Sequence, residues 1–123
     1  MTEDPLPRVR EICLALPEVV ETADNEMARP SFRVRGKSFG MYMDNHHGDG
    51  RVGLWCKAPP GMQSALVNSD PERFYVPPYV GPSGWVGIRF DLKEADWDQV
   101  ADLIEQGYRM TAPKRLIALL DQE

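Results

Sequence analysis

Apolar residues recur along the chain with two spacings, one typical of helices and the other of strands. Those at positions 6, 9, 12, 13 and 16 have helical spacing and predict a first helix over residues 5–16, which Pro17 ends. Strand-like alternation follows on both sides of a turn at residues 35–37, and again over residues 52–56 after a segment rich in turn formers. A helix, a β-hairpin and a third strand are therefore predicted.

The alternation in the hairpin also predicts which side chains face the core. Arg33 and Arg35 are expected to face solvent, because they alternate with apolar neighbours. The apolar positions expected to be buried are Phe32, Val34, Phe39 and Met41.

The second half of the chain mixes short helices and strands. A short helix is predicted to end near Ser69, followed by strands over residues 74–76 and 84–90 with a loop rich in proline and glycine between them. Apolar residues at positions 97, 100, 101, 104 and 108 predict the longest helix, and a last helix begins after Pro113. Strands joined by short turns pair antiparallel. We therefore expect one α+β domain over residues 1–123, a two-layer sandwich with helices on one side of about five strands.

Three segments resemble the MmcQ/YjbR family: residues 29–39 (RPSFRVRGKSF), 75–86 (YVPPYVGPSGWV) and 108–116 (YRMTAPKRL). With the start at residues 16–18 and the strand at residues 54–57, they cover almost the whole chain. The resemblance implies an α-β(3)-α-β(2)-α fold, similar to secretion chaperones and related to the double-wing arrangement, in which hairpins present a sheet to a DNA groove. DNA binding is what the resemblance implies, although a fold alone does not establish a function.

Composition and charge narrow the classes of function. The hydrophobic content of 42% is that of an ordinary globular protein, and neither a signal peptide nor a membrane span is evident, so a cytoplasmic protein without membrane contact is expected. The net charge of -5 argues against strong, indiscriminate binding to nucleic acid. Residues 27–43 and 107–117, however, contain cations and no acids, so any anion-binding surface must come from these two stretches.

The first basic stretch has two interpretations. Arg33, Arg35 and Lys37 form a basic ridge on the predicted hairpin, where a wing would contact phosphates. The alternative is a solvated strand face that charge protects against edge-to-edge pairing.

The second basic stretch is more informative. Lys114 and Arg115 lie in the first turn of the last helix, where cations oppose the helix dipole. With nearby Arg109 and free backbone N–H groups, they could hold a phosphate or carboxylate. The alternative is that they form ion pairs with acids of the preceding helix.

Aromatic residues suggest a second candidate surface. Trp55 and Lys57 share one strand face, and Tyr75, Tyr79 and Trp85 surround the loop rich in proline and glycine. Exposed aromatic rings beside cations can stack on bases or grip a peptide, whereas buried rings would only support the loop.

Other reactive residues do not form a recognisable site. His46 and His47 are adjacent in a turn without a second pair of ligands, so no metal is expected, and Cys13 and Cys56 are predicted to be reduced core residues. No motif assembles a nucleophile, a base and an orienting acid, and no glycine pattern fits a nucleotide, so neither catalysis nor a cofactor is expected.

The sequence and the resemblance favour a small non-enzymatic protein that binds DNA weakly through its phosphates, and a monomer is expected. The alternative is a module that binds a protein or peptide through the sheet and the loop from Tyr75 to Trp85. A third possibility, an enzyme or small-molecule binder, would need a pocket between Trp55, Lys57, Trp85 and Lys114.

Overall fold

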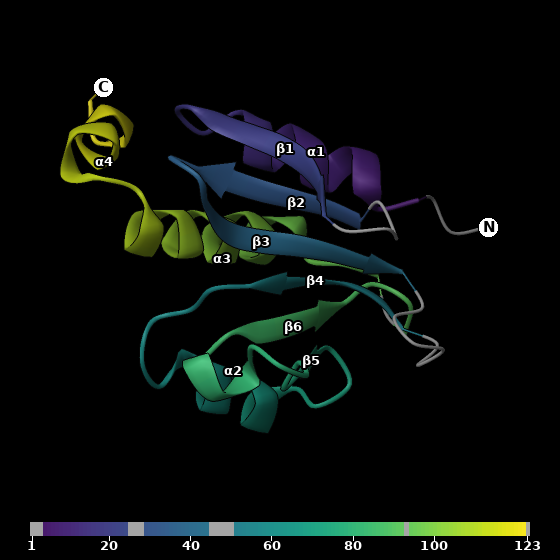
Figure 1. Cartoon of the computed structure of the whole chain (residues 1–123). Coiled ribbons are helices and arrows are strands. Elements are labelled where there is room, and N and C mark those ends of the chain that lie inside the picture. The colour runs from purple at the N-terminus through teal and green to yellow at the C-terminus, as the bar shows by residue number, and fades with distance from the viewer. Residues whose placement is uncertain (1–3, 25–28, 45–50, 93, 123) are drawn as a thin grey trace.

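The computed structural model describes residues 4–24, 29–44, 51–92 and 94–122. Its strands form one antiparallel sheet of six, in the order β1-β2-β3-β4-β6-β5 (Figure 1). The strands are β1 (Val19–Asp24), β2 (Arg29–Val34), β3 (Lys37–Asp44), β4 (Val52–Cys56), β5 (Phe74–Tyr75) and β6 (Val86–Arg89). The helices are α1 (Leu6–Leu14), α2 (Met62–Ser69), the 3-10 turn η2 (Gly81–Ser83), α3 (Trp97–Thr111) and α4 (Lys114–Leu120). No helix in the described ranges is long and apolar enough to cross a membrane.

The expected α+β fold with an antiparallel sheet is confirmed, but the sheet has one strand more than the sequence predicted. The additional strand is β1, which pairs with β2 from Val19↔Val34 to Asp24↔Arg29. It lies at the edge of the sheet, where Val20 and Ala23 are exposed, and an edge strand needs little apolar alternation.

The turn between β2 and β3 is a tight one in which two successive residues have left-handed backbones. Arg35 has φ 51° and Gly36 has φ 80°, which is the pattern of a two-residue hairpin loop. The pairing register shifts between Phe32 and Arg33, so that Phe32 opposes Gly40 whereas Arg33 opposes Ser38. This irregularity leaves Phe39 as an additional residue in β3.

The register shift overturns part of the predicted burial pattern. Phe32, Val34 and Phe39 are fully buried in the main core, as predicted. Met41, by contrast, is only partly buried and packs on the opposite face of the sheet, because the additional residue reverses the alternation after Phe39. Arg35 is exposed as predicted, and Arg33 is half-buried.

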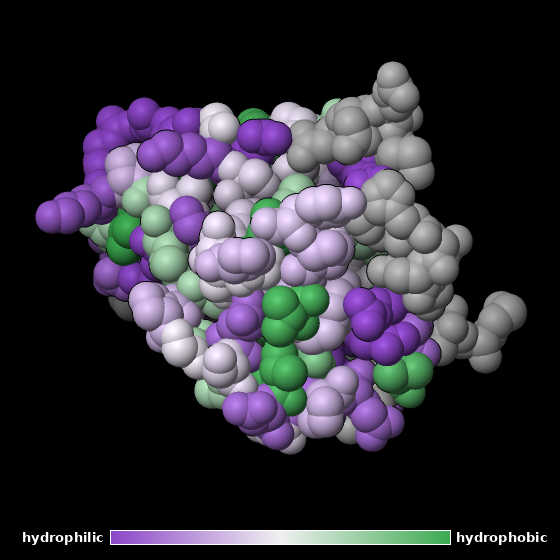
Figure 2. Space-filling model, turned by 60° about the horizontal axis from the view of Figure 1, so that its bottom comes forward, coloured by the Kyte–Doolittle hydropathy of each residue, from purple (hydrophilic) through white to green (hydrophobic). Residues whose placement is uncertain are grey.

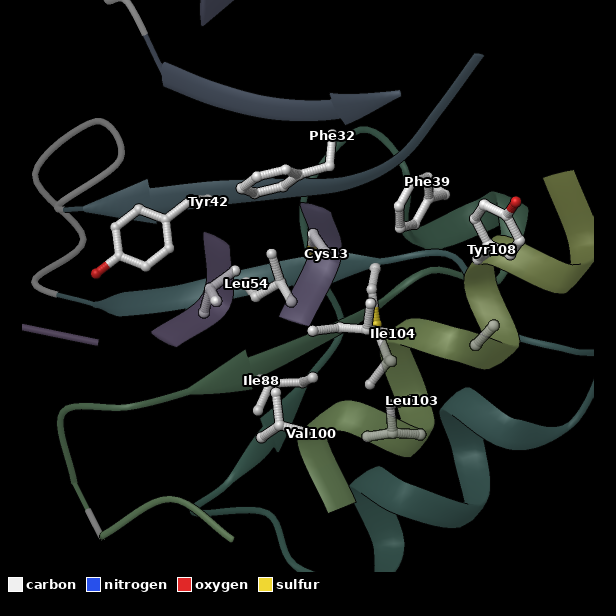
Figure 3. Packing of buried hydrophobic residues seen from close by; sticks show 14 of the residues in the cluster. Cys13, Phe32, Phe39, Tyr42, Leu54, Ile88, Val100, Leu103, Ile104 and Tyr108 are labelled. Atoms are coloured by element: carbon white, nitrogen blue, oxygen red, sulfur yellow. The ribbon is translucent and has the colours of Figure 1, made fainter. Parts of the chain in front are cut away.

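The main core lies between the sheet and the helices α1 and α3, which are behind the sheet in Figure 1. Ile104 and Val100 of α3 face Leu54 and Ile88 of the central strands (Figure 3). At one end of this core, the rings of Phe39 and Tyr108 meet edge to face, with centroids 5.7 Å apart. These contacts fix α3 along the sheet, so the end of α3 near Tyr108 has a defined position relative to the hairpin.

Candidate nucleic-acid interface

The two basic stretches of the sequence meet at one end of the sheet. In Figure 1 the turn between β2 and β3 and the helix α4 both lie at the left-hand end, although they are far apart in the chain. We call this place the basic end, formed by Arg35 and Lys37 of the turn and by Lys114 and Arg115 of α4. Hydrophilic side chains also gather at the left-hand end in Figure 2.

Glu18 joins the two basic segments. Nε of Arg35 donates to Oε1 of Glu18 at 2.9 Å, and Nη2 donates to Oε2 at 3.3 Å, so the guanidinium grips the carboxylate with two hydrogen bonds. Nη2 of Arg115 lies 3.7 Å from the same Oε2. A single carboxylate therefore contacts arginines from both stretches, so the two stretches are close enough for one anionic group to contact both.

Hydrogen bonds fix the segment that carries Glu18, between α1 and β1. The hydroxyl of buried Tyr108 donates to the carbonyl of Pro17 at 2.8 Å, and the N–H of Val19 donates to the carbonyl of Leu16 at 3.3 Å. Burial is the main cause that raises the pKa of Tyr108, followed by the nearby charge of Glu18. The loop between α1 and β1 is therefore fixed from the α3 side.

The lysines of the candidate set differ from the arginines in their contacts. Within the ranges that the structure describes, the ammonium groups of Lys37, Lys57 and Lys114 have no ion-pair or hydrogen-bond partner. Lys37 and Lys114 are exposed, whereas Lys57 is half-buried. Lys57 follows β4, and its carbonyl would lie only 2.7 Å from a Cβ at position 107, so Gly107 allows α3 to approach there.

Arg33 and Arg109 contribute less to this site than the sequence suggested. Arg33 uses Nε to donate to Oγ1 of Thr22 at 3.2 Å and Nη1 to donate to the carbonyl of Gly36 at 3.2 Å. Arg109 pairs with Asp121 at 2.7 Å and with Glu105 at 3.1 Å. These hydrogen bonds raise the pKa of Arg109, with the bond to Asp121 as the largest cause. Arg109 is thus paired with an acid of its own helix α3 and with Asp121 after α4. The alternative proposed for Lys114 and Arg115 was an acid of the preceding helix, but the carboxylate near Arg115 is that of Glu18, before β1.

The start of α4 offers fewer free backbone donors than expected. The helix has seven residues, and the N–H groups of Leu116 and Ile117 both donate to the carbonyl of Pro113, at 3.0 and 3.2 Å. The side chains of Lys114 and Arg115, rather than the helix start, are therefore what this segment can present to an anion.

The predicted aromatic surface is mostly buried. Trp55, Tyr75 and Trp85 form a second cluster with Met43 on the sheet face away from α1 and α3, and their exposed fractions are 3%, 8% and 7%. Nε1 of Trp55 donates to the hydroxyl of Tyr75 at 2.7 Å. These three rings therefore support the sheet and the loop, as the alternative interpretation held.

Tyr79 is the exception among the aromatic candidates. Its exposed fraction is 76%, and its backbone has φ 67°, which is rare for a residue other than glycine. Nearby Val76 is 53% exposed. Nε2 of Gln63 donates to the carbonyl of Gly81 at 2.8 Å, which ties the same loop to α2. Figure 2 shows a small strongly hydrophobic group set among hydrophilic and intermediate residues, not a broad apolar surface.

The remaining reactive residues form no recognisable centre in the described ranges. His46 and His47 lie outside these ranges, and no three His, Cys, Asp or Glu side chains within them are placed to hold a metal ion. Burial raises the pKa of Cys56 to about 12 and also raises that of Cys13, so neither thiol is an activated nucleophile. Of the residues proposed to form a pocket, Trp55 and Trp85 lie in the second cluster, whereas Lys114 lies on α4.

Glu18 is the residue of this site that the sequence did not reveal. It lies in the segment Leu16-Pro17-Glu18, which was noted as part of the family resemblance but gave no sign of its partners. Arg35 is 17 residues away, and Arg115 is farther still along the chain. The positive φ of 58° at Glu18 was equally invisible before the fold was known.

Comparison with known proteins supports the fold. A family model described as YjbR matches residues 14–110. The chain is similar to the crystal structure of the Deinococcus radiodurans protein DR2400, which carries a DUF419 domain, with a TM-score of 0.70 and 19% sequence identity. The likeness covers 85% of this chain and 76% of that one. A search of curated proteins found no match.

Proposed function

The chain belongs to the YjbR family, and on that premise we propose that it is a non-enzymatic protein that binds DNA weakly through the phosphates of the backbone. One observation carries the proposal. Arg35 and Arg115, from two distant basic stretches, both approach the carboxylate of Glu18 at the basic end, to which Lys37 of the turn and Lys114 of α4 also belong. Phosphate contacts by Lys and Arg supply most of the affinity in DNA binding that does not depend on sequence.

Charge separation reconciles this proposal with the acidic composition. Several exposed acids lie at the opposite end of the sheet, where Asp44 ends β3 and Glu94, Asp96 and Asp98 surround the start of α3. The acids nearer the basic end are paired with arginines: Glu18 with Arg35, and Glu105 and Asp121 with Arg109. Salt screens charges that are more than about 8–10 Å apart at physiological ionic strength. A phosphate at the basic end is therefore affected mainly by the local excess of cations and only weakly by the net charge of -5.

A salt series with labelled duplex DNA tests the proposal. If three to four phosphates are contacted, the logarithm of the binding constant should fall with the logarithm of salt concentration at a slope of about -3 to -4. Fluorescence anisotropy of the duplex measures this slope. The double variant Lys114→Glu with Arg115→Glu should abolish binding, while circular dichroism confirms that it folds.

A control variant of equal charge is needed, because any added acid weakens attraction to DNA. Arg8→Glu, Ser64→Glu and Ala65→Glu together lower the net charge by the same four units at exposed positions of α1 and α2. This control should retain most of the binding. The proposal fails if the wild type does not bind at low salt, or if the basic-end variant binds as well as the control does.

A second candidate function is the binding of a protein or peptide. Tyr79 favours it, because an exposed aromatic ring held on a rare backbone conformation in a tethered loop is suited to anchor a partner. This candidate ranks second because Trp55, Tyr75 and Trp85 are buried. The sequence had predicted that these three rings belong to the same binding surface as Tyr79. It would move ahead if the wild type showed no DNA binding at low salt.

A further inference from the structure

Glu18 occupies the position in the basic end where an anionic ligand would bind. The guanidinium of Arg35 presents two parallel donors to its two carboxylate oxygens, and Arg115 approaches one of those oxygens from α4. The planar fork of arginine fits a phosphate with the same two-bond geometry as a carboxylate. The contacts that Glu18 makes are therefore the contacts that a backbone phosphate would make.

The backbone at both partners indicates that this contact is not a product of relaxed local geometry. Glu18 has φ 58° and Arg35 has φ 51°, and of the described residues other than glycine only Tyr79 also has a positive φ. Residues with a side chain rarely adopt this left-handed backbone conformation, and glycine or asparagine would adopt it with less strain. The chain instead has an acid at one position and an arginine at the other, and the two side chains bind each other.

Glu18 can also be displaced. The side chains of Glu18 and Arg35 are about half exposed, at 49% and 46%, and that of Arg115 is 73% exposed. Ion pairs exposed to this degree are weak, so a phosphate can compete for the arginines. The loop under Glu18 stays in place when its side chain moves, because Tyr108 holds the carbonyl of Pro17.

We propose that Glu18 is an internal competitor for phosphate, which occupies Arg35 and Arg115 in the free protein and must leave them when DNA binds. The inference rests on the proposed DNA binding and deepens it, since it names the arginines that receive the phosphate and the residue that limits the affinity. Removal of the Glu18 charge should therefore strengthen binding.

The test compares Glu18→Gln with Glu105→Gln by fluorescence anisotropy on the same duplex. Glu105 pairs with Arg109 near the same end of α3. The control therefore removes one carboxylate charge, as Glu18→Gln does, but this carboxylate pairs with an arginine outside the proposed site. Glu18→Gln should bind about 3- to 5-fold more tightly than wild type, which is the upper part of the range that an exposed ion pair supports. Glu105→Gln should change binding by less than about 2-fold. The gain should disappear when Arg35→Ala is combined with Glu18→Gln.

Each result separates this inference from the function on which it rests. If the wild type binds with the expected salt slope but Glu18→Gln gains nothing, or no more than Glu105→Gln, the inference is wrong and the proposed function remains. If only Glu18→Gln binds, the competitor is supported and the proposed function of the wild type is wrong. If neither binds, both are wrong. Glu18→Asn, which suits a left-handed backbone, replaces Glu18→Gln if that variant does not fold.

Discussion

The two helices at the C-terminal side of the chain begin with opposite charges, at opposite ends of the sheet. At the start of α3, Asp96 caps the helix by accepting from the N–H of Gln99 at 3.2 Å, and Asp98 lies in the first turn. At the start of α4, Lys114 and Arg115 follow Pro113, which provides no side-chain cap. Acids stabilise a helix start and cations do not. The acids thus serve their own helix, whereas the cations have no such folding role.

The same contrast extends to the partners of the charges. Arg89, at the end of β6, pairs with Asp91 only two residues later, at 2.7 Å. At the basic end, Arg35 and Arg115 reach across the fold to Glu18. An ion pair between sequence neighbours stabilises the local backbone conformation. Cations from distant segments, by contrast, come together only in the folded protein. This difference is the reason to look for a ligand at the basic end.

The largest expected effect concerns the helix that joins the two ends. Ile104 lies in the middle of α3, and 1% of it is exposed. Replacement of Ile104 by Ala should lower the free energy of unfolding by roughly 2 to 4 kcal/mol, because a cavity would remain in the core. A urea titration measures the loss. A change below about 0.5 kcal/mol would show that α3 does not hold the two ends together as described.

A pair of alanine substitutions tests the two helix starts directly. Asp96→Ala should lower the free energy of unfolding by about 1 kcal/mol, because the N–H of Gln99 loses its cap. Lys114→Ala should leave it unchanged within about 0.5 kcal/mol, or raise it slightly, because an exposed cation is removed from a helix start. Thermal unfolding of both variants provides the measurement. Equal losses in the two variants would contradict the distinction drawn between the two ends.

The sequence predicted the fold well where local patterns decide the structure. Helical spacing located α3, and the turn residues located the hairpin at Arg35 and Gly36. The edge strand β1 was missed because its exposed side chains lack a clear apolar alternation, and the face of Met41 was wrong because one additional residue in β3 reverses every later side chain.

The candidate site was only half visible for a similar reason. The basic stretches can be read from the sequence, because charge and its local surroundings are sequence properties. Glu18 could not be identified, because its role depends on the contact of three distant segments and on a backbone conformation that no residue pattern signals. The hydrogen bond from the hydroxyl of Tyr108 to the carbonyl of Pro17, next to Glu18, joins residues 91 apart in the chain, and local spacing does not encode such contacts.

The smallest expected effect concerns the turn at the basic end. Arg35 occupies a left-handed position for which asparagine is favoured in two-residue hairpin turns, so Arg35→Asn relieves strain that Arg35→Ala retains. Both variants lose the ion pair with Glu18, and therefore Arg35→Asn should be more stable than Arg35→Ala by about 0.5 to 1 kcal/mol. Both should bind DNA equally weakly, with a salt slope about one unit smaller than that of wild type. Chemical denaturation and anisotropy together separate the two effects. If Arg35→Asn bound DNA as well as wild type, the arginine would be a turn residue only, and the basic end would lose the contact that joins its two segments.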